Sequence, residues 1–270
     1  MISYKYQENN RIMDILIAIT LPFLGTTLGA LMVFFIKEEL DERLEKTLLG
    51  FASGVMVAAS VWSLLIPSME LTQHLEKLSF LPVVIGLFAG FGVLLLIDEI
   101  VPHLHFKTGE VEGVKSGLKR DTMLMLAMTI HNFPEGAAAG AMIAGVLNND
   151  ATMTMSSALI LSLGIAIQNF PEGAVVALPL KTEGGSSLKA FIMGTLSGIV
   201  EPIAAIMMIF FAKYLHGLLP YMLSFAAGAM LYVVVEELIP ESNGGKHSNI
   251  ATIGFALGFA IMMVLDITLG

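Results

Sequence analysis

The sequence has no cysteine and few charged residues, and both shortages narrow what the protein can be. Without cysteine it can form no disulfide bond and offer no thiolate metal ligand, so any metal must be held by nitrogen, oxygen or methionine sulfur. Charged residues make up 14% of the 270 positions, whereas an average soluble domain has about 25%. Hydrophobic residues make up 56%, and no segment has the composition of a soluble domain.

Two familiar motifs are also missing. No stretch resembles a nucleotide-binding loop, so nothing indicates work driven by ATP. No His-Glu-x-x-His pair is present, which disfavours a zinc peptidase. The formal net charge of −9 disfavours an anionic substrate, and we expect neither a nucleic-acid partner nor an organic cofactor.

Apolar runs of about 20 residues, the length that crosses a bilayer core of about 30 Å, recur along the chain. They predict an all-α membrane protein with eight transmembrane helices in a single domain that covers residues 1–270. The predicted spans are Met13–Ile36, Leu48–Pro67, Leu81–Val101, Asp121–Leu147, Thr152–Leu180, Ser187–Ala212, Leu218–Pro240 and Asn249–Leu269.

Basic residues in the links predict the orientation, because short cytoplasmic loops are enriched in Lys and Arg. Ten basic residues lie in alternate links on one side: Lys37, Arg43, Lys46, Lys107, Lys115, Lys119, Arg120, Lys181, Lys189 and Lys246. The other side has four: Lys5, Arg11, Lys77 and Lys213. We therefore expect a plasma (cytoplasmic) membrane protein with both termini outside the cytoplasm.

Part of the chain repeats itself. The segment Phe51–Met56 (FASGVM) recurs as Phe225–Met230 (FAAGAM). Two further matches keep the same order: Gly25, Thr26 and Gly29 with Gly194, Thr195 and Gly198, and Gly86, Gly90 and Asp98 with Gly254, Gly258 and Asp266. Spans 1–3 thus pair with spans 6–8, a shift of five spans, and an odd shift inverts the second triplet. Chance similarity among Gly-rich spans is the alternative. An inverted repeat around a central pair, spans 4 and 5, is typical of secondary transporters that work by alternating access.

The central pair carries two matching polar blocks, His131–Gly136 (HNFPEG) and Gln168–Gly173 (QNFPEG). The first and fifth residues of each block lie on one helix face, because they are four positions apart. A buried carboxylate costs about 2.5–3.5 kcal/mol on membrane-insertion scales, so it needs a partner. A metal cation is the simplest partner for the constellation His131, Glu135, Glu172 and Glu201. Isolated polar residues in spans, in contrast, are often packing hydrogen-bond donors.

HNFPEG followed by QNFPEG, with Glu201-Pro202 in the next span, resembles the ZIP (Zrt-, Irt-like) divalent-metal transporters, in particular the bacterial GufA-like branch. The resemblance covers essentially all eight spans. It implies a homodimer in the lipid bilayer that moves Zn²⁺ into the cytoplasm through an intramembrane two-metal site. Imidazole, carboxylate and amide donors also suit Cd²⁺, Fe²⁺ and Mn²⁺ better than Ca²⁺.

The same resemblance implies the ligands of both metal positions. The first position would use Met56, His131, Glu135, Gln168 and Glu172. The second would use Asn132, Asn169 and Glu201, with Glu135 and Glu172 bridging the two. Some relatives have an acidic residue where this chain has Asn169, and the amide lowers the negative charge of the second position.

Polar residues at the ends of the spans are candidates for the route of the metal. Those expected on the exit side are Asp98, Glu99, His103, His105, Glu236 and Glu237. Asp266, near the outer end of the last span, is a candidate on the uptake side. Charged residues also cap spans at membrane interfaces without binding metal, and this alternative applies to all of them.

Two other classes of function fit part of the pattern. One is an intramembrane zinc-dependent metalloenzyme, in which His131 and Glu135 hold a catalytic zinc. The other is a metal sensor or a passive metal-selective channel. Many carboxylate ligands weaken the activation of zinc-bound water, so we expect a transporter rather than an enzyme.

Overall fold

A computed structural model gives the fold and describes residues 2–36, 40–104, 111–148, 150, 152–182, 185–214, 217–245 and 248–270, with side chains from residue 11 onward. Seven helical stretches in these ranges are long and apolar enough to cross a membrane. The stretch predicted as the fourth span forms a further helix, α5 (Arg120–Leu147), of 28 residues. The prediction of an all-α membrane protein is confirmed.

The helices follow one another with short connections. They are α1 Ile2–Leu31, α2 Glu42–Ala59, α3 Ile66–Leu71, α4 Phe80–Ile100, α5 Arg120–Leu147, α6 Met155–Thr182, α7 Ser187–Ser197, α8 Val200–Tyr214, α9 Leu219–Val233, α10 Ile239–Asn243 and α11 Ile250–Leu269. The shorter elements are the 3₁₀ turns Met32–Phe34 and Gln73–Leu78, the π-helical segments η2 (Ser60–Leu65) and η4 (Val234–Leu238), and the strands β1 (His103–Leu104) and β2 (Val111–Glu112).

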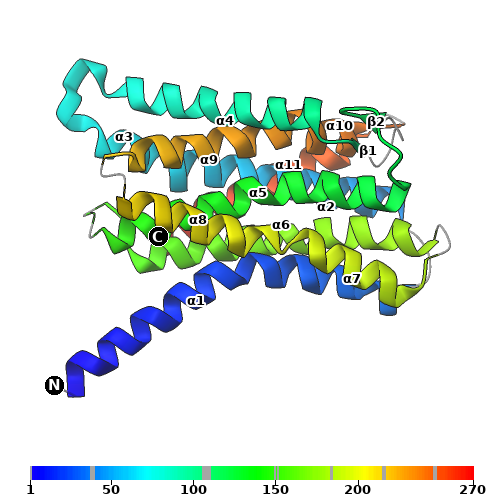
Figure 1. Ribbon diagram of the computed structural model, residues 1–270, viewed down its shortest axis with the longest axis horizontal. Coiled ribbons are helices and arrows are strands. Elements are labelled where there is room, and N and C mark those ends of the chain that lie inside the picture. The colour runs from blue at the N-terminus through cyan, green and yellow to red at the C-terminus, as the bar shows by residue number, and fades with distance from the viewer. Residues whose placement is uncertain are drawn as a thin grey trace.

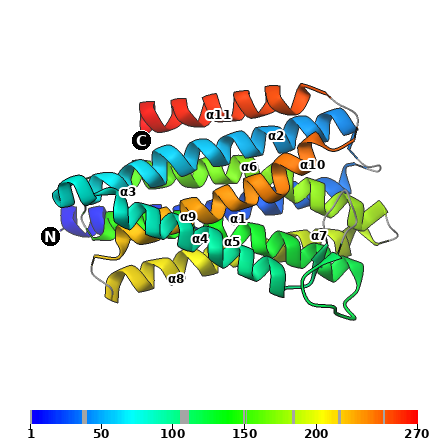
Figure 2. The same ribbon diagram turned by 90° about the horizontal axis from the view of Figure 1, so that it is seen from above.

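The long helices lie roughly side by side, and the two ends of the bundle differ (Figures 1 and 2). Both termini lie toward one end, called here the termini end. The hairpin of β1 and β2 lies at the other, called the hairpin end. The sixth predicted span, Ser187–Ala212, is interrupted at Gly198 and Ile199, which separate α7 from α8. This break places Glu201 in the first turn of a new helix.

The predicted inverted repeat is visible in how the helices pack. Helix α2 packs along α11, and α9 packs along α4. In both pairs glycines let the helices approach so closely that a Cβ would overlap a backbone carbonyl of the partner helix. The matched contacts are Gly258 on Phe51 and Gly90 on Phe225, Gly254 on Thr47 and Gly86 on Tyr221, and Gly54 on Phe255 and Gly228 on Leu87. Each contact maps onto its counterpart at the offsets found in the sequence.

The repeat also extends to an unusual local structure. Segment η2 continues α2, and η4 continues α9 at the matching position. Each is followed at once by a short helix with proline at its second residue, Pro67 or Pro240. π-helical segments are rare and occur frequently at functional sites. Here η4 carries Glu237, whose side chain is buried.

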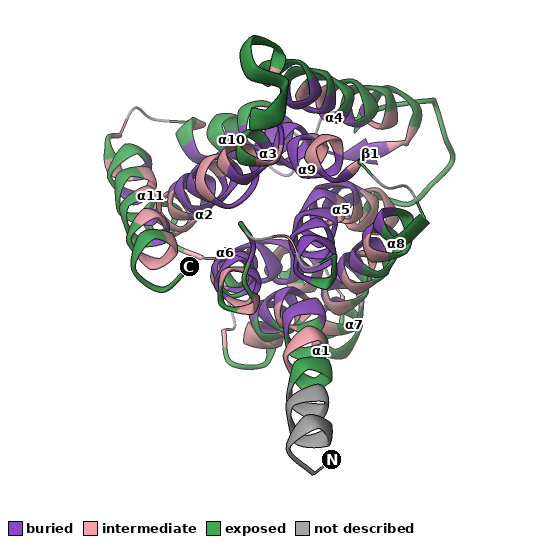
Figure 3. Cartoon of the chain, turned by 90° about the vertical axis from the view of Figure 1, so that its left-hand side faces the viewer, coloured by how far each residue is buried: buried purple, intermediate pink, exposed green. Residues whose placement is uncertain are grey.

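Buried residues gather where the helices face one another, and exposed residues lie on the outer surface of the bundle (Figure 3). Helices α4 and α11 are mostly exposed, and their large apolar side chains include Phe88, 70% exposed, and Ile267, 66% exposed. An apolar surface of this kind suits contact with lipid. Helices α5 and α6 turn their polar blocks into the bundle, where α1 packs on α6 and α8 packs on α5.

Candidate metal centre

The polar residues of the two blocks and Glu201 are all buried: His131, Asn132, Glu135, Gln168, Asn169, Glu172 and Glu201. The glycine at the end of each block lets a neighbouring helix pack closely against the block. A Cβ at Gly136 would overlap the backbone of Glu201, and one at Gly173 would overlap the carbonyl of Thr26. The two glycines therefore allow α8 and α1 to pack closely against the centre.

Amide and hydroxyl groups occupy one oxygen of two of the buried carboxylates. Gln168 Nε2 donates to Glu135 Oε1 at 2.8 Å. Thr26 Oγ1 donates to Glu201 Oε1 at 2.7 Å. Asn169 Nδ2 in turn donates to Thr26 Oγ1 at 3.3 Å. These bonds fix the side chains and leave the second oxygen of each carboxylate unbonded.

Six buried polar atoms of the centre have no hydrogen-bond partner within the described parts of the chain. They are Asn132 Nδ2, Glu135 Oε2, Gln168 Oε1, Asn169 Oδ1, Glu172 Oε1 and Glu201 Oε2. An unsatisfied buried polar group costs about 1–3 kcal/mol, and more when it is charged. Five of the six are oxygens, the donors that divalent cations take from carboxylates and amides.

The charges of the centre are unbalanced. Glu172 interacts electrostatically with Glu135 and Glu201, and all three carboxylates are buried. The first turn of α8 holds Glu201, where the positive end of the helix dipole favours a negative group. That dipole offsets only part of one charge, so three ionised carboxylates here would need a further counterion.

A line of polar side chains that could bind metal runs from the centre toward the hairpin end. His131 Nε2 lies 3.3 Å from Glu237 Oε1, and the same oxygen lies 4.0 Å from His103 Nε2. His103 Nε2 also lies 3.1 Å from Asp98 Oδ1, and Tyr232 donates to Asp98 Oδ2 at 2.8 Å. Glu237 therefore connects the central blocks with a second group of side chains that could hold a metal ion.

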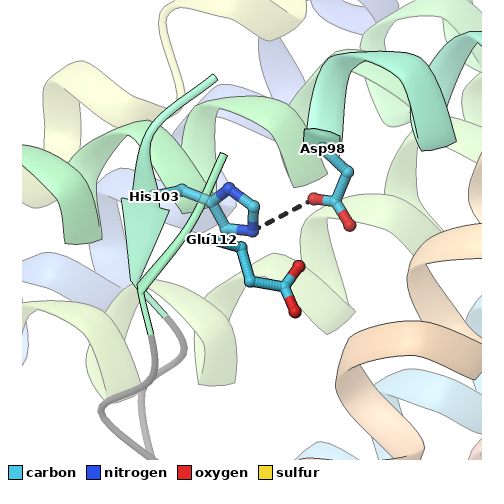
Figure 4. A group of neighbouring side chains, drawn as sticks. All are labelled: Asp98, His103 and Glu112. Carbon is cyan, nitrogen blue, oxygen red and sulfur yellow. Dashed lines mark ion pairs between the residues drawn. The ribbon is translucent and has the colours of Figure 1, made fainter. Parts of the chain in front are cut away.

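The second group contains a residue from the hairpin. Ligand atoms of Asp98, His103 and Glu112 all lie within 4.8 Å of one another (Figure 4). Glu112 reaches this position because β2 pairs with β1 in the register that sets it opposite His103. His103 Nδ1 lies 2.9 Å from the carbonyl of Val101. A proton on Nδ1 would bond this carbonyl and leave Nε2 facing the carboxylates, a common arrangement for metal-binding histidine.

Comparison with known proteins identifies the family. A profile of the family described as ZIP zinc transporter matches residues 107–266, which include both blocks, Glu201 and Glu237. The zinc transporter GufA of Myxococcus xanthus is 38% identical, over 94% of this chain and 98% of that protein. ZIP11 of Homo sapiens is 34% identical over 91% and 94%, and ZIPB of Bordetella bronchiseptica is 36% identical over 92% and 79%. The chain belongs to the ZIP family.

The other residues that the ZIP resemblance makes candidates differ in how deeply they are buried. Met56 is fully buried in α2 among apolar side chains, and its role as a ligand stays a prediction. Glu99 and Glu236 are exposed, unlike their buried neighbours Asp98 and Glu237. His105 lies outside the described residues.

Asp266 lies near the termini end of α11 and is half-buried. Its Oδ1 accepts a hydrogen bond from Ser63 at 2.9 Å. Ser63 lies in η2, and the repeat maps this pair onto Glu237 and Asp98 at the opposite end. The two ends of the bundle therefore have equivalent positions with different side chains, one carboxylate (Asp266) at the termini end and two (Asp98 and Glu237) at the hairpin end.

Sequence reasoning missed two residues of the site, Thr26 and Glu112. In the sequence Thr26 stands out only as part of the repeat, since a single hydroxyl in a Gly-rich span usually bonds its own helix. Glu112 lies in the long link between the third and fourth spans, where no periodic pattern predicts a two-residue strand. Its pairing with His103 was not predictable from spacing.

Proposed function

We propose that this ZIP protein carries Zn²⁺, and the related cations Cd²⁺, Fe²⁺ and Mn²⁺, across the plasma membrane into the cytoplasm. The whole chain, residues 1–270, acts as one transmembrane domain of eight spans. His131, Glu135, Gln168 and Glu172, with Met56, bind one ion, while Asn132, Asn169 and Glu201 bind a second. Glu135 and Glu172 bridge the two ions, and alternating access exposes them first to the outside and then to the cytoplasm.

The observation that carries the proposal is the set of five buried oxygens without hydrogen-bond partners in the described structure. They belong to the two blocks and Glu201, and the buried carboxylates among them repel one another. A divalent cation would satisfy the oxygens and balance the charge together. The relatives named zinc transporters support zinc as that cation and support a transporter rather than an enzyme.

The ligands toward the hairpin end support an exit route. Glu237 lies within 4.0 Å of both His131 Nε2 and His103 Nε2. An ion leaving the centre can therefore exchange one ligand at a time on its way to Asp98, His103 and Glu112. Stepwise exchange avoids passing a bare ion through an apolar core. Asp266 and Ser63 are the corresponding candidates for uptake.

Proteoliposomes that enclose a zinc-sensitive dye test the proposal. The wild type should show saturable zinc uptake, which Glu172→Gln and His131→Ala abolish. Glu76→Gln removes an exposed carboxylate far from the centre and should leave uptake unchanged. Full zinc uptake by both centre variants would show that the two blocks do not take part in transport. Linear uptake without saturation would instead favour a channel, and hydrolysis of peptides by the purified protein would favour the metalloenzyme.

A further inference from the structure

A hydroxyl group outside both blocks, that of Thr26, lies next to the buried side chains of the centre. Thr26 comes from α1 and is only 1% exposed. Its oxygen lies between two residues of the proposed second metal position, 2.7 Å from Glu201 Oε1 and 3.3 Å from Asn169 Nδ2. Three helices, α1, α6 and α8, therefore meet at this atom.

Thr26 helps to determine which way the amide of Asn169 faces, together with the Glu135 and Glu201 carboxylates, with which Asn169 also interacts. A carboxylate with a cation beside it is ionised and can only accept hydrogen bonds, so the single hydroxyl proton is committed to Glu201. Whatever else bonds the hydroxyl oxygen must then be a donor, and Asn169 can supply only its NH₂ group. Its carbonyl oxygen is thereby turned away from Thr26.

The atoms left over are the ones a cation needs. Asn169 Oδ1 and Glu201 Oε2 are both buried, and neither has a hydrogen-bond partner in the described residues. With the amide reversed, NH₂ protons would face the ion and repel it. The Thr26 hydroxyl thus leaves one oxygen of Asn169 and one oxygen of Glu201 free to face a cation.

Close packing holds Thr26 in place. A Cβ at Gly198 would lie 3.0 Å from Thr26 Cβ and 3.1 Å from Glu201 Oε1. On the other side, Gly173 abuts the carbonyl of Thr26. Because Gly173 and Gly198 lie against Thr26 on two sides, a shift of α1 at this point would also move α6 or the break between α7 and α8. The geometry is therefore rigid, as a residue that orients metal ligands requires.

We propose that Thr26 is a positioning residue for the second metal position: it turns Asn169 Oδ1 and Glu201 Oε2 toward the ion and sets the affinity for it. This inference rests on the proposed function. It also explains how the centre can use Asn169, an amide with only one ligating oxygen, where a carboxylate would ligate through either oxygen.

The chain offers a matched control. Thr195 is the repeat counterpart of Thr26, and its buried hydroxyl has no hydrogen-bond partner in the described part of the chain. Thr195→Val therefore makes the same chemical change in an equivalent span without touching the network. Thr26→Ser keeps the hydroxyl and removes the methyl group, so it separates positioning from packing.

The experiment is zinc titration calorimetry of the purified full-length protein, with bound zinc counted by mass spectrometry. The wild type should bind two ions. Thr26→Val should weaken one of them about 10- to 100-fold, the range for removing a group that orients a metal ligand. Thr26→Ser and Thr195→Val should bind like the wild type. Thr26→Ala, which is smaller, serves as a second test if the valine variant does not fold.

A double variant identifies the position affected. In Glu201→Gln, which already lacks the second position, adding Thr26→Val should not weaken the remaining ion further. The inference is overturned if Thr26→Val binds both ions as the wild type does, if Thr26→Ser is equally impaired, or if Thr195→Val is. A wild type that binds no zinc, or does not transport it, would instead refute the proposed function.

Discussion

At the scale of single residues, the centre depends on amides as much as on carboxylates. Gln168 donates to Glu135 Oε1 and keeps its own Oε1 free for metal. Gln168→Leu should remove one ligand and release Glu135. We expect zinc uptake to remain saturable with KM raised about 10- to 100-fold. Ser162→Ala, a buried hydroxyl on the same helix without a partner in the described structure, is the control and should leave KM unchanged. An unaltered KM in Gln168→Leu would show that the amide is only a packing group.

His103, just beyond the end of α4, gives a prediction about pH. Burial lowers the pKa of His103, but the bonds to Asp98 and to the Val101 carbonyl outweigh it and raise the pKa above 6.5. Because the fold favours the protonated ring, this ring stabilises the protein below pH about 6.5. The stabilisation is lost as the pH rises through the raised value. In metal-free protein, an NMR titration of the ring should have its midpoint above 6.5, and Asp98→Asn should lower that midpoint. A wild-type midpoint at or below 6.5 would contradict this.

At the scale of helices, close packing of glycines holds the repeat together. Gly258→Val and Gly90→Val each place a side chain against a backbone carbonyl of the partner helix. Overpacking of this kind costs about 1–3 kcal/mol, so both variants should have a lower thermal unfolding midpoint. Gly92, on the same helix as Gly90, faces open space, and Gly92→Val should have little effect. Equal midpoints for Gly90→Val and Gly92→Val would mean that α4 and α9 can separate without loss.

The repeat could be predicted from the sequence because it is carried by spacing. Gly90 and Gly258 recur at the same positions relative to their spans, although the helix that each one contacts was not predicted. The break at Gly198 was not predicted, since one glycine in an apolar run is compatible with a continuous helix. Burial of the two blocks followed from their place in apolar spans. Which amide oxygen stays free could not be predicted, because it depends on Thr26, a hydroxyl from a different helix.

At the scale of the whole molecule, the remaining question is which end of the bundle faces the cytoplasm. Ten basic residues in alternate links, against four on the other side, predict that the hairpin end does. The direction of transport depends on this, because the ligands from Glu237 to Glu112 form an exit only if they face the cytoplasm.

The natural absence of cysteine makes the orientation directly measurable. Single cysteines can be introduced as Glu76→Cys toward the termini end and as Ser116→Cys at the hairpin end, both at exposed positions. A membrane-impermeant maleimide should label Glu76→Cys in intact cells and Ser116→Cys only after permeabilisation. The unmodified protein, which cannot react, is the control. The reverse pattern would make Asp98, His103 and Glu112 the uptake side. Labelling of both variants in intact cells would place both sites outside the cell. The single span between them, α4, forbids this, so that result would contradict the eight-span topology.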